Sequence, residues 1–359
     1  MPLYRNDNQI LKWLAVNILM VVMMVIIGGI TRLTDSGLSM TEWKLIGGVI
    51  PPINENDWSI LFEKYKNFPE FNLKNFDFEL IEFKKIFFWE YFHRIWGRLI
   101  GITFFCPLIF YWIKNRLTNY EKKFLIILSF LGCFQAFMGW FMVKSGLVDK
   151  PDVSHFRLAL HLLIALIIYS MLLFLFCKIY RNKKIDHSMS KGKSLKFLKK
   201  TLLASIILIS FTIISGAFVA GTNAGLAYNN FPLMGENLLP PLLLSNQTLN
   251  LSTTFNDIGF IQFFHRSLAT LTLIFIISIV VFNLKNNLHF YFKKGLILLL
   301  VSILLQYTLG IIILKLFVPF TLGLFHQLGS LIILSILTIL LAETSCNQIA
   351  ETSCNQIKN

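Results

Sequence analysis

The sequence is poor in charge, and its cysteines form no recognisable framework. Only 14% of its 359 residues are charged, whereas 55% are hydrophobic. Soluble domains carry about 25% charged residues, so this composition excludes a soluble globular protein and is typical of a polytopic membrane protein. The five cysteines have no spacing typical of zinc ligands or of a disulfide framework.

Acidic residues are scarcer than basic ones, and the net charge is +14. In a soluble protein such an excess would suggest nucleic-acid binding. Here most Lys and Arg lie in short segments between apolar runs, whereas the segment 221–262 contains neither. This distribution predicts membrane topology and no nucleic-acid partner, with the basic loops in the cytoplasm and the long segments 31–91 and 221–262 outside.

Eight apolar segments each approach the roughly 20 residues that cross a bilayer as a helix. The first leads into Gly28-Gly29 and no cleavage site, so it is interpreted as an anchor rather than a signal peptide. We therefore predict an all-α membrane protein with eight transmembrane helices and both termini on the cytoplasmic or matrix side. The predicted segments are 13–30, 92–113, 124–143, 158–177, 201–220, 263–284, 295–314 and 322–341.

The two halves of the chain repeat each other. Because each half holds an even number of helices, the repeat is parallel, and it predicts two pseudo-symmetric four-helix bundles. The predicted regions are 1–180, a basic linker 181–200, 201–341, and a polar tail 342–359 that contains an exact duplication of eight residues. The matches are Thr34–Ser39 with Thr222–Ala227, Pro51-Pro52 with Pro240-Pro241, His93-Arg94 with His265-Arg266, Gln135 and Gly139 with Gln306 and Gly310, and His161 with His326.

Four of the seven histidines belong to this repeat. They fall near the outer ends of alternate helices, and two imidazoles facing each other at one depth are typical of a planar metal macrocycle ligated on both faces. A lone membrane histidine more commonly joins helices by a hydrogen bond. The other histidines are interpreted as a pocket-rim residue (His155) and as cytoplasmic loop residues (His187 and His289).

Arginines also lie at the outer helix ends, against the positive-inside bias. Guanidinium groups suit heme propionates, so these arginines are pocket candidates. Pairing with Glu90, Asp152 or phospholipid headgroups is the alternative. The candidates are Arg94, Arg98, Arg157 and Arg266.

One mismatch breaks the repeat, because Glu90 in the first half corresponds to Gln262 in the second. A carboxylate can take or give a proton or stabilise positive charge, and an amide cannot. This predicts chemistry in the first half and electron supply in the second, with Glu90 as the catalytic residue. The alternative for Glu90 is a structural ion pair with Arg94.

These motifs resemble the heme A synthase family. The resemblance rests on Gly28–Ser39, Glu90–Arg98 and Phe156–His161, and it covers all eight helices. It implies an oxidoreductase of the cell inner membrane, or of the mitochondrial inner membrane, that oxidises the C8 methyl of heme O to the formyl of heme A for terminal oxidases. It implies His93 and His161 as axial ligands of the substrate heme, and His265 and His326 as ligands of a heme b cofactor.

The resemblance also implies partners, namely heme O synthase and an electron donor that the residues do not identify; a homo-oligomer is left open. Many bacterial members carry a cysteine pair in the outer loops, and neither 31–91 nor 221–262 contains cysteine. The chain therefore resembles the branch without that pair.

Two rival functions stay open at this point. A diheme b-type cytochrome would exchange electrons with quinone, but such proteins place two histidines on one helix, and no predicted helix here does so. A transporter would also explain an internal repeat, yet the apolar segments lack charges at mid-membrane.

Overall fold

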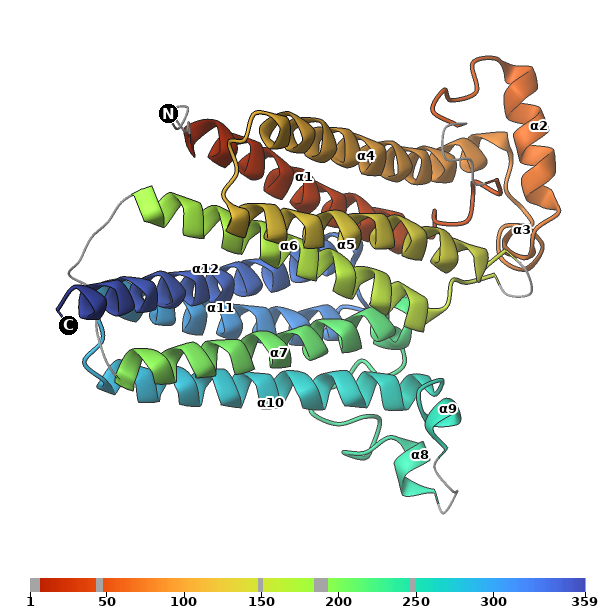
Figure 1. The fold of residues 1–359 in the computed structure, drawn as a ribbon. Coiled ribbons are helices and arrows are strands. Elements are labelled where there is room, and N and C mark those ends of the chain that lie inside the picture. The colour runs from red at the N-terminus through yellow and green to blue at the C-terminus, as the bar shows by residue number, and fades with distance from the viewer. Residues whose placement is uncertain (1–6, 43–47, 148–150, 184–192, 246–249, 359) are drawn as a thin grey trace. The chain divides into compact units, whose positions relative to one another are not determined.

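The computed structural model describes residues 7–42, 48–147, 151–183, 193–245 and 250–358. Across these ranges the named elements are helices, and eight of them are long and apolar enough to cross a membrane (Figure 1). The prediction of an all-α, multi-pass membrane protein is confirmed. The eight are α1 (Asp7–Leu33), α4 (Leu80–Ile113), α5 (Asn119–Lys144), α6 (His155–Lys183), α7 (Lys193–Gly221), α10 (Ile258–Lys285), α11 (Phe290–Lys315) and α12 (Phe320–Lys358).

The segments predicted to lie outside carry short helices. The first contains α2 (Glu55–Lys66) and α3 (Pro69–Leu73). The second contains the 3-10 turn η1 (Ala224–Leu226) and the helices α8 (Pro241–Leu244) and α9 (Leu251–Thr254).

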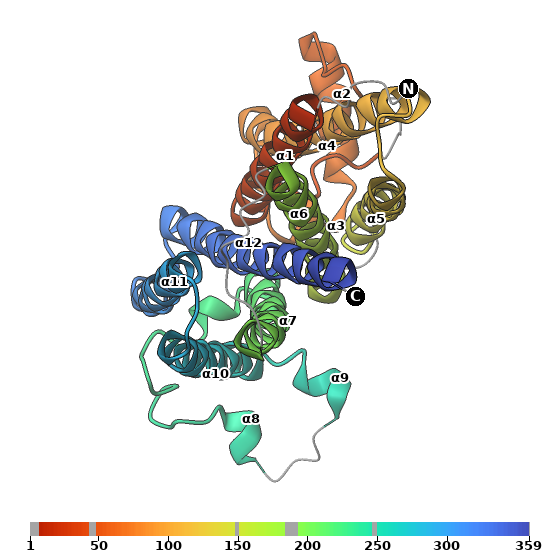
Figure 2. The ribbon, with the colours of Figure 1, turned by 60° about the vertical axis from the view of Figure 1, so that its left-hand side comes forward.

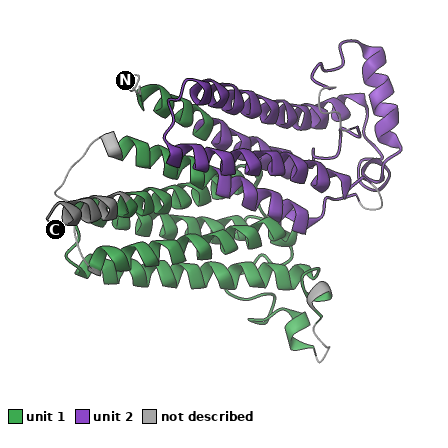
Figure 3. Ribbon diagram, in the orientation of Figure 1, with its two compact units in different colours: residues 1–18, 169–219, 223–359 green, residues 19–168, 220–222 purple. Residues whose placement is uncertain are grey.

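The chain divides into two compact units (Figure 3). Unit 1 comprises residues 1–18, 169–219 and 223–359, and unit 2 comprises 19–168 and 220–222. All four helices of the predicted second half therefore belong to unit 1, apart from the last residues of α7. The region boundaries at 180, 200 and 341 remain predictions.

In unit 2, α4 begins twelve residues before the predicted apolar segment, at Leu80 rather than at position 92. A capping box explains this early start, because the Glu82 side chain accepts a hydrogen bond from the Glu79 backbone N–H at 3.2 Å. Glu90 and His93 therefore lie inside a long helix rather than at its opening. Helical geometry fixes their side chains on one face.

The extra turns of α4 support a small aromatic cluster in unit 2. Figure 1 shows α2 and α3 beside the N-terminal end of α4. The buried aromatic rings of the outer segment pack edge-on or tilted against those of α4. The outer segment therefore has a small hydrophobic core of its own. The cluster consists of Phe62, Tyr65, Phe83, Ile86 and Phe87.

A carboxyl group is buried beneath this cluster. Glu70 is 4% exposed and accepts a hydrogen bond from the Tyr65 hydroxyl at 2.9 Å, while Asn75 Nδ2 donates to that hydroxyl at 2.8 Å. Burial raises the pKa of Glu70 to about 8, with the charges of Glu90 and Asp35 acting in the same direction. Because removal from water disfavours the charged form, this region contains a group that titrates near neutral pH.

In unit 1, α10, α11 and α12 pack in sequence, and α7 lies against α10 (Figure 2). The Thr212 and Thr272 hydroxyls join α7 to α10 at 2.7 Å. An extended apolar core fills the space between these helices. Its fully buried members include Leu198, Leu202, Ile276, Val280, Phe292, Leu296, Leu299 and Leu337.

The final helix extends further than predicted. The tail expected to be polar and separate, 342–359, continues α12 as far as Lys358. Its first turn is tied to the bundle, because Arg181 of α6 forms an ion pair with Glu343 at 2.5 Å. Arg181 and Glu343 are far apart in the sequence, so the apolar pattern alone could not reveal their contact.

Candidate functional site

The structure brings the four repeated histidines together as two pairs, one in each unit. His93 on α4 lies within electrostatic range of His161 on α6, and His265 on α10 lies within that range of His326 on α12. Each histidine therefore has its expected partner nearby, and the role of the two pairs as heme ligands stays a prediction. No helix contributes two members of a pair.

His265 has a defined hydrogen-bond partner. The Ser215 hydroxyl lies 2.8 Å from His265 Nδ1 and donates its only proton to the Thr212 carbonyl at 2.7 Å. In the tautomer whose Nδ1–H donates to the Ser215 hydroxyl, Nε2 is the nitrogen with a free lone pair. Such a second partner is typical of a metal-ligating histidine. The repeat places Ile27 at the position of Ser215, so His93 lacks this hydroxyl.

Glutamines accompany the other histidine of each pair. Gln135 Nε2 lies 3.2 Å from His161 Nε2, and Gln306 Nε2 donates to the backbone carbonyl of His326 at 2.8 Å. Three buried polar atoms at these places have no hydrogen-bond partner: His161 Nδ1, His326 Nδ1 and Gln135 Oε1. Buried polar groups are normally satisfied, so these atoms mark the two pairs as sites that the polypeptide alone leaves incomplete.

Glu90 is 3% exposed and holds the outer segment of unit 2 to α4. Its Oε2 accepts hydrogen bonds from the Ser39 hydroxyl and the Met40 N–H, both at 2.7 Å. Its Oε1 pairs with Arg94, one helical turn away. The ion pair considered from the sequence is present, and it coexists with two contacts from residues that are about 50 positions distant.

Gln262, the repeat partner of Glu90, is equally buried but faces opposite groups. Its Nε2 donates to the carbonyl oxygens of Gly225 at 3.3 Å and Tyr228 at 3.0 Å. Its Oε1 accepts from Arg266 Nη2 at 3.2 Å. The position thus keeps its arginine partner in both units, whereas its partners in the outer segment change from donors to acceptors.

The arginines bind outer-segment carbonyls in equivalent ways. Arg94 Nη2 donates to the Met40 carbonyl at 2.9 Å, and Arg266 Nη2 donates to the Tyr228 carbonyl at 2.7 Å. Met40 and Tyr228 are themselves matched by the 188-residue offset between Thr34 and Thr222. The structure therefore gives the sequence repeat a matching hydrogen bond.

The remaining arginine candidates lie on the same helices or their neighbours. Arg157 near the start of α6 donates to the Phe141 carbonyl at 2.7 Å, with its guanidinium 3.7 Å from the Phe141 ring centroid. Arg98 follows Arg94 by one turn of α4. Asp152 pairs with Lys74 at 2.6 Å rather than with an arginine.

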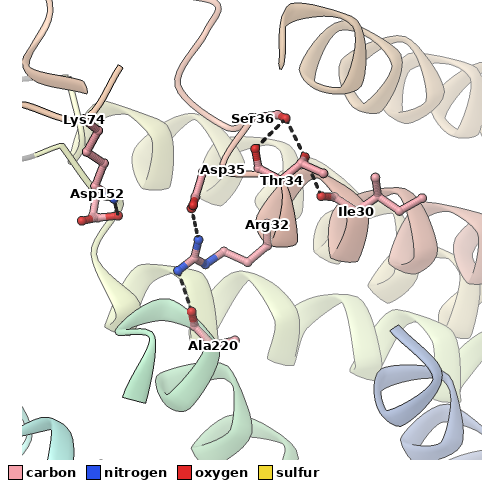
Figure 4. Close-up of polar contacts among 8 residues, drawn as sticks. All are labelled: Ile30, Arg32, Thr34, Asp35, Ser36, Lys74, Asp152 and Ala220. Atoms are coloured by element: carbon pink, nitrogen blue, oxygen red, sulfur yellow. Dashed lines mark hydrogen bonds and ion pairs between the residues drawn. The ribbon is translucent and has the colours of Figure 1, made fainter. Parts of the chain in front are cut away.

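Arg32 anchors the outer end of α1 in unit 2. It forms an ion pair with Asp35 and donates to the Ala220 carbonyl at 2.6 Å (Figure 4). Thr34 and Ser36 share a hydrogen bond at 2.6 Å in the same turn. Asp35 adopts a positive φ of 46°, so this turn reverses the chain directly toward Ser39 and Glu90.

The other histidines and the cysteines lie away from the pairs. His155 is the first residue of α6 and packs against Gly221, and His289 is the N-cap of α11. His187 lies outside the described residues. Cys106, Cys133 and Cys177 form no disulfide among the described residues.

The donor set fits a macrocycle better than a bare ion. Among the described residues, no three His, Cys, Asp or Glu side chains gather as a metal cluster. Two imidazoles and four ring nitrogens of a heme would complete the coordination of iron in each pair. His161 and His326 each keep one buried ring nitrogen, Nδ1, without a hydrogen-bond partner, so each pair has a nitrogen donor that the group could use.

Comparisons with known proteins agree with this geometry. Residues 11–338 match the COX15-CtaA family, described as cytochrome oxidase assembly protein. A protein of Flavobacterium psychrophilum named heme A synthase is 42% identical over 340 residues, covering 93% of this chain and 97% of the relative.

Two further relatives with the same name come from other bacteria. That of Rickettsia bellii is 40% identical over 336 residues, covering 92% of this chain and 96% of its own length. That of Pelagibacter ubique is 40% identical over 344 residues, covering 95% and 98%. Similarity of this extent and coverage shows that the chain belongs to the heme A synthase family of cytochrome oxidase assembly proteins.

Proposed function

We propose that this protein is a heme A synthase, which oxidises the C8 methyl group of heme O to a formyl group. The carrying observation is that two matched imidazole pairs exist and only one has a buried carboxylate beside it. Substrate heme lies between His93 and His161 in unit 2. A heme b cofactor lies between His265 and His326 in unit 1.

The two pairs are suited to different tasks. Heme b, when bound, supplies one-electron transfer. The Ser215 hydroxyl lies 2.8 Å from His265 Nδ1, and a hydrogen bond from this Nδ1–H would leave Nε2 free for a resident cofactor. His93 has Ile27 at the equivalent position and makes no such bond to it, and this suits a substrate that must be released.

Glu90 is the catalytic residue of the first site. Conversion of a methyl to a formyl group breaks two C–H bonds, adds one oxygen atom and removes four electrons, which an external oxidant must accept. The protons that leave the carbon need an acceptor, so a carboxylate beside the substrate lowers the barrier. Its carboxylate also stabilises positive charge that develops on the oxidised carbon. Arg94, Ser39 and the Met40 N–H orient both oxygens.

The arginines hold the polar edge of each heme. Each guanidinium has five N–H donors, and those of Arg94, Arg157 and Arg266 use only part of this capacity on carbonyl oxygens. The remaining donors, with those of Arg98, bind propionates. This role would keep the arginines at the outer membrane surface against the positive-inside bias.

The protein acts in a membrane together with other proteins. The eight apolar helices and the bacterial relatives favour the bacterial plasma membrane, with both termini in the cytoplasm and the imidazole pairs near the outer surface. The mitochondrial inner membrane is the alternative. Heme O synthase supplies the substrate, and a separate donor supplies electrons.

Extraction of pigments tests the proposal directly. Cells that express this chain together with a heme O synthase should yield heme A on chromatography, and cells with the synthase alone should yield heme O. Heme O alone from cells whose membranes show a low-spin bis-histidine spectrum would contradict the proposal. That result would favour the rival function, an electron-carrying diheme b-type cytochrome.

A further inference from the structure

Each of the four paired histidines packs against a glycine on a neighbouring helix. His93 lies against Gly28 of α1, and His265 lies against Gly216 of α7. The second members of the pairs follow the same rule: His161 lies against Gly139 of α5 and His326 against Gly310 of α11.

The glycines are themselves matched by the repeat. Gly28 and Gly216 are 188 residues apart, the same offset as Thr34 and Thr222. Gly139 and Gly310 share the offset of Gln135 and Gln306, 171 residues. Glycine inside a helix is less stable than alanine, so its presence at four matched places needs a compensating reason.

The reason is space for the imidazole ring. A Cβ atom at Gly139, Gly216 or Gly310 would lie 3.1 Å from Cε1 of the facing histidine. Carbon atoms prefer separations of about 3.5–4.0 Å, so alanine would push the ring by several tenths of an ångström. At Gly28 the nearest atom would be His93 Nε2 at 3.4 Å, which is an ordinary contact.

We propose that Gly139, Gly216 and Gly310, and to a smaller extent Gly28, are positioning residues for the heme ligands. This inference rests on the proposed function. Each glycine lets the ring lie directly against the next helix, so the backbone of that helix sets the position and plane of the imidazole. Ligands held by rigid elements give a metal site its precision.

The surroundings of each ring rank the expected effects. His265 is also held by Ser215, so its ring cannot turn away from a methyl group at Gly216. Nδ1 of His326 has no hydrogen bond, so this ring can yield more easily to a methyl group at Gly310. In unit 1, Gly216→Ala should therefore have a larger effect on the heme ligand than Gly310→Ala. In unit 2, Gly139→Ala should have a larger effect than Gly28→Ala.

The chain offers matched controls. A Cβ at Gly101 of α4 or Gly132 of α5 would meet nothing within 4 Å. Gly132 lies two turns from Gly139 on the same helix. Gly101→Ala and Gly132→Ala should keep heme content and should raise thermal stability slightly, because alanine is the better helix former.

The test uses the purified holoprotein in detergent, with electron paramagnetic resonance of the low-spin heme and heme retained per polypeptide. Gly216→Ala and Gly310→Ala should shift the g-values and weaken heme retention roughly 10-fold or more, as loss of a second-shell partner does. Gly139→Ala should weaken binding of added heme O to a similar degree and leave the resident heme signal unchanged. Each variant thus contains its own folding control in the other unit.

Three results would overturn the inference. If wild type shows the low-spin signal and Gly216→Ala and Gly310→Ala match the control variants, the glycines do not position the ligands and the proposed function stands. If every alanine variant, controls included, loses both hemes, the effect is general helix packing. If wild type itself holds no low-spin heme, the proposed function fails and this inference fails with it.

Discussion

Glu90 in unit 2 and Gln262 in unit 1 occupy equivalent positions and meet outer segments of opposite hydrogen-bonding character. Around Glu90 the segment presents a hydroxyl and a backbone N–H, whereas around Gln262 it presents two carbonyl oxygens. The mismatch is therefore not a single substitution but a change of the residue and its surroundings together. Ser39 accompanies the carboxylate, and its repeat partner Ala227 accompanies the amide.

The shared features are as informative as the difference. An arginine one turn later binds the matched carbonyls of Met40 and Tyr228 in both units. The arginine contact that ties the outer segment to the helix is thus common to both units, whereas the Glu90 and Gln262 position and its contacts differ. The carboxylate suits the donors around it, and the amide suits the carbonyl oxygens around it. Chemistry in unit 2 is therefore a proposal that needs the variants below to separate it from a structural role.

The largest expected effect follows removal of a second-site ligand. His265→Met should replace the bis-histidine spectrum of the resident heme and raise its midpoint potential, because methionine ligation favours the reduced state. His326→Ala should reduce heme retention by more than roughly 100-fold, since loss of a second-shell partner alone costs roughly 10- to 100-fold. Redox titration of the purified variants checks both predictions. Unchanged spectra in both variants would mean that this histidine pair does not bind the heme.

Gln262→Glu should be the next most harmful change. The new carboxylate would face the carbonyl oxygens of Gly225 and Tyr228, which now accept hydrogen bonds, and only Arg266 would favour it. The expected cost is about 1–3 kcal/mol of unfolding free energy, measured by thermal unfolding in detergent. An increase in stability would mean that these carbonyls do not define the site.

Ser39→Ala tests whether the surroundings of Glu90 matter for its role. Loss of one donor to a charged oxygen costs about 1.5–3 kcal/mol, and we expect heme A formation to fall by roughly 10-fold with the protein still folded. Ala227→Ser, the reciprocal change in unit 1, is the control and should leave heme A formation unchanged. Equal behaviour of the two variants would remove the distinction between the outer segments.

The most local effect concerns the buried Glu70, for which unit 1 has no matched carboxyl among its described residues. Its folded pKa of about 8 exceeds the ordinary value of 4.5, so the folded state retains a proton that the unfolded state has lost. Stability of the α2–α3 region should therefore fall as pH rises from 4.5 to 8, by a few kcal/mol on the order of the shift.

Glu70→Gln should remove this pH dependence, because the amide stays neutral. Hydrogen exchange of α2 and α3 at several pH values is the measurement. Glu63→Gln is the control, since Glu63 is exposed and pairs with Lys66. A slope that persists in Glu70→Gln would assign the titration to another group.

Much of the fold was predictable from local pattern. Hydropathy gave the eight spans, and the repeat indicated the histidine pairs before any coordinates. Local pattern did not give the start of α4 at Leu80, because the capping box uses Glu79, a residue uncommon at N-caps. The contact of α12 with the distant Arg181 is likewise absent from any local signal.

The site was predictable in part for the same physical reason. Glu90, His93 and Arg94 are close in sequence, so helical spacing places them together. Ser39 and Met40 reach Glu90 across about 50 residues, and Ser215 reaches His265 across 50. Ser215 directly precedes Gly216, which the repeat matches with Gly28. This adjacency is the one feature of the sequence that points to Ser215.

The most direct test of chemistry in unit 2 is chromatography of hemes extracted from cells that express Glu90→Gln with a heme O synthase. The substitution is nearly isosteric but presents an amide where Arg94, Ser39 and Met40 all act as donors, so one of them loses its acceptor. We expect a folded protein that retains the resident heme signal, accumulates heme O or a hydroxymethyl intermediate, and forms heme A at least about 10²-fold more slowly. Normal heme A from Glu90→Gln would contradict the account, because the carboxylate would then serve only as the structural partner of Arg94.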